Sequence, residues 1–186
     1  MISVKVKLFN TPYVLKDKEK VIFPFRKAEA LFYYLCVNKQ ATRDELAALL
    51  WGDHDETSAK KYLRNAMYRI RKTLGLEIII SPQKQVVMIN PDIEMKSDLS
   101  VFLNRETEGI DVYTGEFLKG FLVKDADAFI EWTRNKMEYF RELYISKLIK
   151  YIDRNLKSQE NRKIEHYTRL LIQTDEFDER AYRILM

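Results

Sequence analysis

The 186-residue sequence predicts an α+β region at the N-terminus and an all-α region after it. Over residues 2–9, apolar residues alternate with polar ones, as in a strand with one buried face. Three helical segments follow, the third of them strongly basic, and then two apolar runs joined by a proline-containing turn. This order is that of a winged helix with an added N-terminal antiparallel sheet. From residue 97 onward the spacing is helical nearly throughout, typical of tetratricopeptide-like helical repeats.

Composition indicates a folded protein with a local basic surface. Hydrophobic residues make up 46% of the chain, enough for a buried core. The longest apolar stretches, such as residues 30–37, are far shorter than the roughly 20 residues of a membrane span. Residues 1–9 alternate like a strand and not like a signal peptide, so we expect a cytoplasmic protein. A net charge of +4 with both signs plentiful indicates one basic patch.

The first elements predicted are three short antiparallel strands and a helix. The strands cover residues 2–9, 13–15 and 21–23, with turns at Thr11-Pro12 and at residues 16–20. The helix covers residues 26–38. Its inward side is expected to carry Ala28, Leu31, Phe32, Leu35 and the single cysteine, Cys36, which we interpret as a core residue.

A helix-turn-helix pattern comes next. Thr42-Arg43-Asp44-Glu45 is a capping box, which begins a short helix with Leu46, Leu49, Leu50 and Trp51 on its apolar side. Gly52 ends that helix, and the polar turn 53–56 leads to a longer helix over residues 57–74. In such a pair the second helix reads a major groove while the first crosses the backbone.

The helix predicted over residues 57–74 has one apolar and one cationic side. Its core side is expected to hold Ala59, Leu63, Ala66, Met67, Ile70 and Leu74. Its opposite side carries Lys61, Asn65, Tyr68 and Lys72, with Lys60, Arg64, Arg69 and Arg71 on the flanks. Six cations and no acidic residue give this segment a charge of +6, against +4 for the whole chain. A basic helix is often only a solvated face or a partner-binding surface, but the neighbouring pattern favours contact with a polyanion.

A hairpin follows the basic helix. Gly75 is predicted to terminate the helix, and residues 77–80 and 85–89 are apolar strands joined by Ser81-Pro82-Gln83-Lys84. A hairpin directly after a recognition helix is a wing.

These segments also resemble a known family. FRKAEALFYYL, ATRDELAALLWGD, LRNA and YRIRKTLG are similar to the DNA-binding domain of bacterial transcriptional activators of the antibiotic-regulatory-protein (SARP) type. The winged helix of that family is similar to that of OmpR-type response regulators. The resemblance implies a DNA-binding domain over residues 1–91.

The remainder of the chain is expected to form a second domain, residues 97–186, after a polar linker that contains Pro91. We predict a short helix over 97–104 capped by Ser97, a polar break at 106–111, a turn-rich segment at 113–121, helices over 127–155 and 162–173, and a helix beginning at Phe177. The broad buried face of the long helix is expected to hold Phe129, Trp132, Thr133, Met137, Phe140, Leu143, Tyr144, Leu148, Tyr151 and Ile152.

The motif YTGEFLKGF, the helix with Trp132 and residues 175–186 resemble the bacterial transcriptional activator domain that follows the winged helix in SARP proteins. Because the chain stops inside a predicted helix, we expect it to be a fragment of a longer regulator. The aromatic residues of this half, including Tyr139, are interpreted as packing residues in preference to a stacking platform for RNA. A peptide-binding or polymerase-facing groove between the helices stays open.

No pattern of a catalytic site, cofactor site or metal site is found in the sequence. His54 and His166 have no cysteine or paired carboxylates at ligand spacing, and neither GxxxxGK[ST] nor GxGxxG occurs. Asp53, Asp55 and Glu56 lack the spacing of a calcium loop and are interpreted as a solvated turn. We therefore expect neither an enzyme nor a bound cofactor.

The DNA-contacting residues are predicted by their chemistry. Arg64, Asn65 and Tyr68 are candidates for base contacts, since arginine and asparagine have bidentate geometry for guanine and adenine. Candidates for phosphate contacts are Arg43, Thr57, Ser58, Lys60, Lys61, Lys72 and Lys84, those near residue 57 helped by free backbone amides at the helix start. Arg69 is ambiguous, and Arg71 is a candidate to brace the wing or sheet through a carboxylate.

The function predicted is that of a sequence-specific regulator that binds double-stranded DNA, and an activator by the resemblance. The resemblance further implies tandem copies on direct repeats, a homodimer on DNA and contact with RNA polymerase. The alternative is an interaction scaffold whose basic face binds a protein partner and not DNA.

Overall fold

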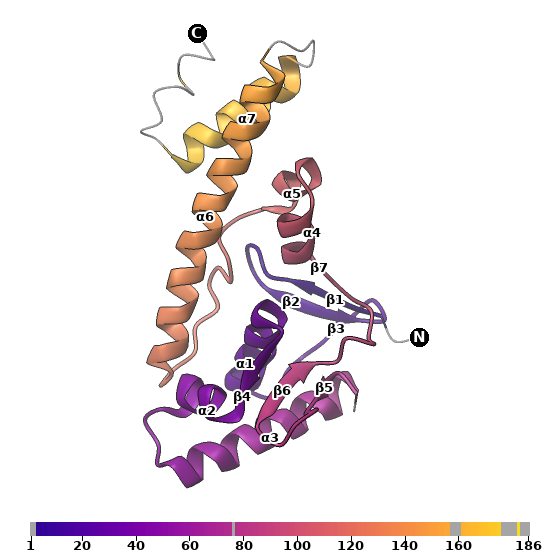
Figure 1. The fold of residues 1–186 in the computed structure, drawn as a ribbon, viewed down its shortest axis with the longest axis vertical. Coiled ribbons are helices and arrows are strands. Elements are labelled where there is room, and N and C mark those ends of the chain that lie inside the picture. Colours follow the sequence, from indigo (N-terminus) through magenta and orange to yellow (C-terminus); the bar gives the residue numbers. More distant parts are fainter. Residues whose placement is uncertain (1–2, 76, 157–160, 176–181, 183–186) are drawn as a thin grey trace.

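The computed structural model describes residues 3–75, 77–156, 161–175 and 182. They form an N-terminal body of sheets and helices, from which a long helix extends as an arm (Figure 1). No helix within these ranges combines the length and the apolar character needed to cross a membrane.

A four-stranded sheet begins the body. Its strands are β1 (Val4–Lys7), β2 (Tyr13–Lys16), β3 (Glu19–Lys20) and β7 (Met95–Ser97), in the order β3-β2-β1-β7. β1 pairs antiparallel with β2, in a register that places Val6 opposite Val14, and parallel with β7. The predicted alternation is confirmed from residue 4 to residue 8, because Val4, Val6 and Leu8 are buried and Lys5 is exposed; Ile2 lies outside the described residues.

Two features of this sheet differ from prediction. The third strand, predicted at residues 21–23, lies at Glu19–Lys20, because Asp17 and Lys18 adopt positive φ angles of 50° and 75° and turn the chain within two residues. Ile22, in the middle of the segment predicted as this strand, is 84% exposed. The second feature is β7, which occupies part of the segment predicted to be a linker. Its partner is more than 80 residues away in the sequence, so local composition gives no signal for it.

The winged-helix elements follow the predicted order. They are α1 (Arg26–Asn38), β4 (Gln40–Thr42), α2 (Arg43–Trp51), α3 (Glu56–Leu74), β5 (Ile79–Ile80) and β6 (Val86–Ile89). The bounds of α1 and the capping box of α2 are confirmed, with the Thr42 side chain accepting from the Glu45 N–H and the Glu45 carboxylate accepting from the Thr42 N–H. The strand β4 was not predicted. It pairs with β6 in a second sheet of order β4-β6-β5, which anchors the wing beside α2.

The second half contains α4 (Asp98–Asn104), α5 (Thr107–Val112), α6 (Asp127–Asn155) and α7 (Asn161–Thr174). Ser97 caps α4 as predicted, and α6 has the predicted bounds. The polar break predicted at 106–111 is wrong, because α5 lies there. Only Gly109 and Ile110 of α5 are buried, so the sequence of this helix shows little apolar periodicity. A Cβ atom at Gly109 would lie 2.8 Å from the carbonyl oxygen of Phe102, so glycine at this position lets α5 pack closely on α4.

The buried face predicted for α6 is confirmed, whereas the packing role predicted separately for Tyr139 is wrong. Phe129, Phe140 and Tyr144 are buried and Trp132 is partly buried, whereas Tyr139 is 52% exposed. The helix α7 packs on the far half of α6, which gives one antiparallel pair of helices. A tetratricopeptide-like array beyond this pair stays a prediction, and the helix predicted to begin at Phe177 falls outside the described residues.

Aromatic side chains join the arm to the N-terminal body. Tyr34 of α1 lies 4.8 Å from Trp132 of α6 between ring centroids, and Phe9 lies 5.8 Å from Phe140. Phe9 also forms a β-bridge with Phe117. The apolar core is thus continuous from the N-terminal sheet to α6. The division of the chain into domains at residues 91–97 remains a prediction.

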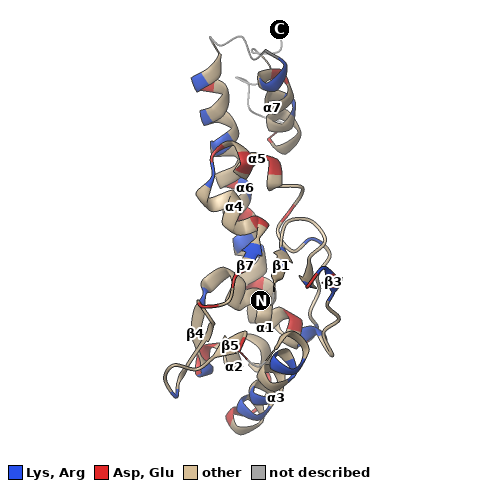
Figure 2. Cartoon of the chain, turned by 90° about the vertical axis from the view of Figure 1, so that its right-hand side faces the viewer, with Lys and Arg blue, Asp and Glu red and all other residues tan. Residues whose placement is uncertain are grey.

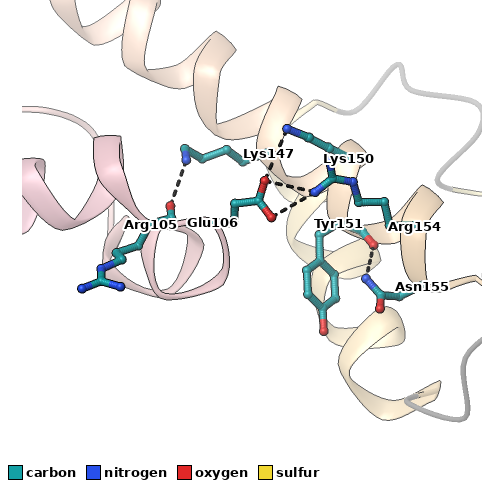
Figure 3. Close-up of polar contacts among 7 residues, drawn as sticks. All are labelled: Arg105, Glu106, Lys147, Lys150, Tyr151, Arg154 and Asn155. Atoms are coloured by element: carbon teal, nitrogen blue, oxygen red, sulfur yellow. Dashed lines mark hydrogen bonds and ion pairs between the residues drawn. The ribbon is translucent and has the colours of Figure 1, made fainter.

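An ionic contact holds the far half of α6 beside the α4–α5 turn (Figure 3). The Glu106 carboxylate accepts from Arg154 at 3.0 Å and pairs with Lys150 at 3.4 Å, while the Lys147 ammonium donates to the Arg105 carbonyl at 3.0 Å. The hydrogen bond from Arg154 lowers the pKa of Glu106. Because these groups are exposed, the contact fixes the register of α6 on the turn more than it stabilises the fold.

Asp98 connects the two halves of the chain at the end of β1. Its carboxylate accepts from the N–H groups of Leu8 at 2.9 Å, Phe9 at 3.0 Å and Leu99 at 2.8 Å. Burial raises the pKa of Asp98, and the hydrogen bonds from Phe9 and Leu8 oppose that shift. The side chain therefore satisfies backbone donors that have no strand partner where β1 ends.

We predict that Asp98→Ala lowers the free energy of unfolding by about 3 kcal/mol, because the N–H groups of Leu8 and Phe9 lose their acceptor. Urea unfolding monitored by circular dichroism measures this. Asp98→Asn should cost less, since its carbonyl oxygen still accepts. Asp92→Ala, at an exposed carboxylate without a hydrogen bond among the described residues, is the control; equal stability of the two alanine variants would contradict the role of Asp98.

Candidate nucleic-acid interface

The helix α3 is held in the body by the six apolar residues predicted for it. Ala59, Leu63, Ala66, Met67, Ile70 and Leu74 are all buried against α1, α2 and the wing. The helix begins one residue earlier than predicted, at Glu56, and is capped by Asp55. It ends at Gly75, whose φ of 123° is readily adopted only by glycine.

We define the outer face of α3 as Lys61, Arg64, Asn65, Tyr68 and Lys72. All five are exposed, and Tyr68 is exposed to 58%. Within the described part of the chain, none of their side chains makes a hydrogen bond or ion pair. Lysines and arginines recur along α3 at the lower end of the molecule (Figure 2). The outer face thus presents three unpaired cations around an amide and a phenol.

Lys60, predicted to contact phosphate, already has acidic partners. Its ammonium donates to the Glu56 carboxylate and lies 3.2 Å from Asp44 Oδ1. The hydrogen bond to Glu56 is the main reason that the pKa of Lys60 is raised. A phosphate at this position would compete with both carboxylates.

The backbone amides at the start of α3 are not all free, contrary to the expectation for the phosphate candidates Thr57 and Ser58. The Asp55 carboxylate accepts from the Ser58 N–H at 3.0 Å, and hydrogen bonds from Ser58 lower the pKa of Asp55. An amide expected to be free for an anion is therefore capped by the chain itself. A phosphate at Thr57 and Ser58 would therefore lack this donor and would lie near the negative charge of Asp55.

Two arginines hold the wing. Arg43 donates through Nε to the carbonyl of Lys84 at 2.8 Å and through Nη2 to Ser81 Oγ at 3.0 Å. Arg71 braces the wing as predicted, but its partner is the Ile79 carbonyl at 2.9 Å and not a carboxylate. A carbonyl partner has no sequence signal, because every residue carries one.

The wing, α2 and α3 enclose a groove of about 420 Å³. It is lined by Arg43, Lys60, Leu63, Arg64, Lys84 and Gln85. The structure thus brings four of the predicted contact residues to one concave surface. Gln85, exposed at the end of the wing turn, lines the same groove but was not predicted to be a site residue. The sequence feature that could have identified it is its position directly after the wing turn.

Among the described residues, the other reactive groups do not form a second site. Cys36 is buried, and burial raises the pKa of its thiol to about 12. His54 lies 3.8 Å from Asp53 in the exposed turn before α3. Across the described residues, no three histidine, cysteine, aspartate or glutamate side chains gather in a way that would hold a metal ion.

Comparison with solved structures identifies a protein with a similar fold. No protein-family model matches the sequence, and no curated protein matches it. Among solved structures, Mycobacterium tuberculosis EmbR, in complex with a low affinity phosphopeptide, matches with a TM-score of 0.72 at 15% sequence identity. The match covers 100% of this chain and 54% of the EmbR chain, so this chain spans about half of that protein's length. The predicted fold class is confirmed: an N-terminal sheet and a winged-helix-like region followed by long helices, an arrangement shared with part of EmbR.

Proposed function

We propose that this protein is a sequence-specific DNA-binding transcriptional regulator that inserts α3 into a major groove. The observation that carries the proposal is the outer face of α3, which presents an amide and cations that no described residue pairs, beside a wing. A helix with these groups fits the major groove, in which base edges offer hydrogen-bond acceptors and donors. The resemblance of the sequence to SARP-type proteins supports an activator.

The proposed roles follow the position and pairing of each side chain. Arg64 and Asn65, in the middle of the outer face, read base edges together with Tyr68. Lys61 and Lys72, toward the two ends of that face, contact phosphates, as does Lys84 at the tip of the wing. Lys60 contributes less because Asp44 and Glu56 already neutralise it.

The partners of the regulator are proposed from the family resemblance. Residues 1–91 would bind DNA, and residues 97–186 would form a bacterial transcriptional activator domain. Tandem copies, or a homodimer, would bind direct repeats and contact RNA polymerase. A protein scaffold is the alternative, and the salt dependence of binding separates the two, because phosphate contacts release counterions.

We predict that Arg64→Ala and Asn65→Ala reduce sequence preference more than total affinity. Each lost bidentate contact should remove about 1–3 kcal/mol of discrimination. The measurement is titration of a sequence selected from a random DNA pool and of its scrambled version. Arg134→Ala and Asn135→Ala are the matched control, an exposed adjacent arginine and asparagine on α6. Equal loss on both DNAs would count against base reading.

Lys60 and Lys61 provide a second prediction. Lys61→Ala should lower the slope of log affinity against log salt concentration by about 1, as expected for one lost phosphate contact. Lys60→Ala should lower the slope less, because its charge is compensated by Asp44 and Glu56. Titrations at several salt concentrations measure both slopes. A decrease of the same size in both variants would mean that Lys60 leaves its carboxylates to bind DNA.

A further inference from the structure

The position of the wing relative to α3 depends on the side chain of Arg43. Arg43 is the first residue of α2, and its guanidinium reaches three separate parts of the fold. Nε donates to the Lys84 carbonyl at 2.8 Å, Nη2 to Ser81 Oγ at 3.0 Å, and Nη1 lies 3.6 Å from the sulfur of Met67 in α3. One side chain therefore connects both ends of the wing turn with the recognition helix.

The backbone of the same residue strengthens this connection. The Arg43 N–H donates to the Gln85 carbonyl at 2.8 Å, and the preceding residue, Thr42, pairs with Val86 in the β4–β6 ladder. Thr42 is also fixed by the capping box of α2. Arg43 thus projects from a rigid base, and its planar fork can hold several acceptors in one geometry.

Lys84 contributes only its backbone carbonyl oxygen to these contacts, as the acceptor for Arg43 Nε. Its side chain is exposed and has no ion-pair or hydrogen-bond partner among the described residues. Arg43 is half-buried, with three of its nitrogens directed at the protein. The cation suited to meet DNA at the wing is therefore Lys84, and the arginine holds it in place.

We infer that Arg43 is a positioning residue that fixes the wing tip beside α3, so that Lys84 and the outer face of α3 engage one DNA site together. This inference rests on the proposed function and replaces a direct phosphate contact by Arg43. A lysine at this position keeps the charge but lacks the fork. It should therefore fail to support the wing, whereas a mere phosphate contact would tolerate the change.

A double-mutant cycle between Arg43 and Lys84 tests the inference. Affinity for the selected DNA is measured at several salt concentrations for wild type, Lys84→Ala, Arg43→Lys, Arg43→Gln, and both Arg43 variants combined with Lys84→Ala. We expect each single variant to lower the salt slope by about 1, and the Arg43 changes to have no further effect once Lys84 is absent. Ser81→Ala, which removes one acceptor and no charge, should weaken binding in the same direction by a smaller factor.

Direct phosphate contact by Arg43 gives a different pattern and would overturn the inference. Arg43→Lys would then bind like wild type, Arg43→Gln would lower the slope by about 1, and Arg43→Gln with Lys84→Ala would lower it by about 2. Thermal unfolding of each variant shows whether a loss of affinity reflects a loss of folding.

Hydrogen exchange without DNA separates this inference from the proposed function. In Arg43→Gln and Arg43→Lys, the Val86 amide, which closes the wing turn on the Gln83 carbonyl, should exchange faster, while amides in the middle of α3 keep their wild-type rates. Unchanged exchange at the wing would overturn the positioning role even if the protein binds DNA. Faster exchange at the wing in the two variants, combined with a wild-type protein that binds selected and scrambled DNA equally, would instead refute the proposed function alone.

Discussion

The burial of one side of α3 is the constraint on which the exposed outer face of α3 depends. The like-charge neighbours Lys60 and Arg64, and Lys61 and Arg64, lie three or four residues apart, and each such pair costs a few tenths of a kcal/mol in an isolated helix. Burying a side chain such as Leu63 or Ile70 contributes about 1.5–3 kcal/mol. Packing therefore outweighs the repulsion, and α3 is held with its apolar residues buried and the cations of the outer face exposed.

The fold then selects which cations remain available. Local charge along residues 57–74 is +6. Glu56 and Asp44 neutralise Lys60, and Arg71 is directed at the Ile79 carbonyl of the wing. The charge of the segment thus divides into a part that organises the protein and a part, chiefly on the outer face of α3, that is free to meet a ligand. A count of lysines and arginines overstates the second part.

Sequence periodicity predicted the long elements because their buried residues recur at helical spacing, in one stripe along α3 and over most of the circumference of α1, where Ala30 and Tyr33 are buried as well. The bounds of α1 and α6 and all six buried residues of α3 follow from spacing alone. The short elements could not be predicted in this way. β4 and β7 exist through pairing with distant strands, and α5 buries only Gly109 and Ile110. At the site, residue type identified the outer face correctly as exposed, whereas the partners of Arg43 and Arg71 are backbone carbonyls, a feature that residue type does not encode.

The continuous aromatic core gives the arm a fixed relation to α3. Tyr34 belongs to α1, which packs on α3, and it meets Trp132 near the start of α6. The same α6 is held at its far half by Glu106, so the helix is restrained at both ends. Close-packed contacts of this kind resist gradual bending, because a rotation of α6 would open voids between the rings. A partner bound to the far half of the arm would therefore keep a set orientation to whatever the outer face of α3 binds.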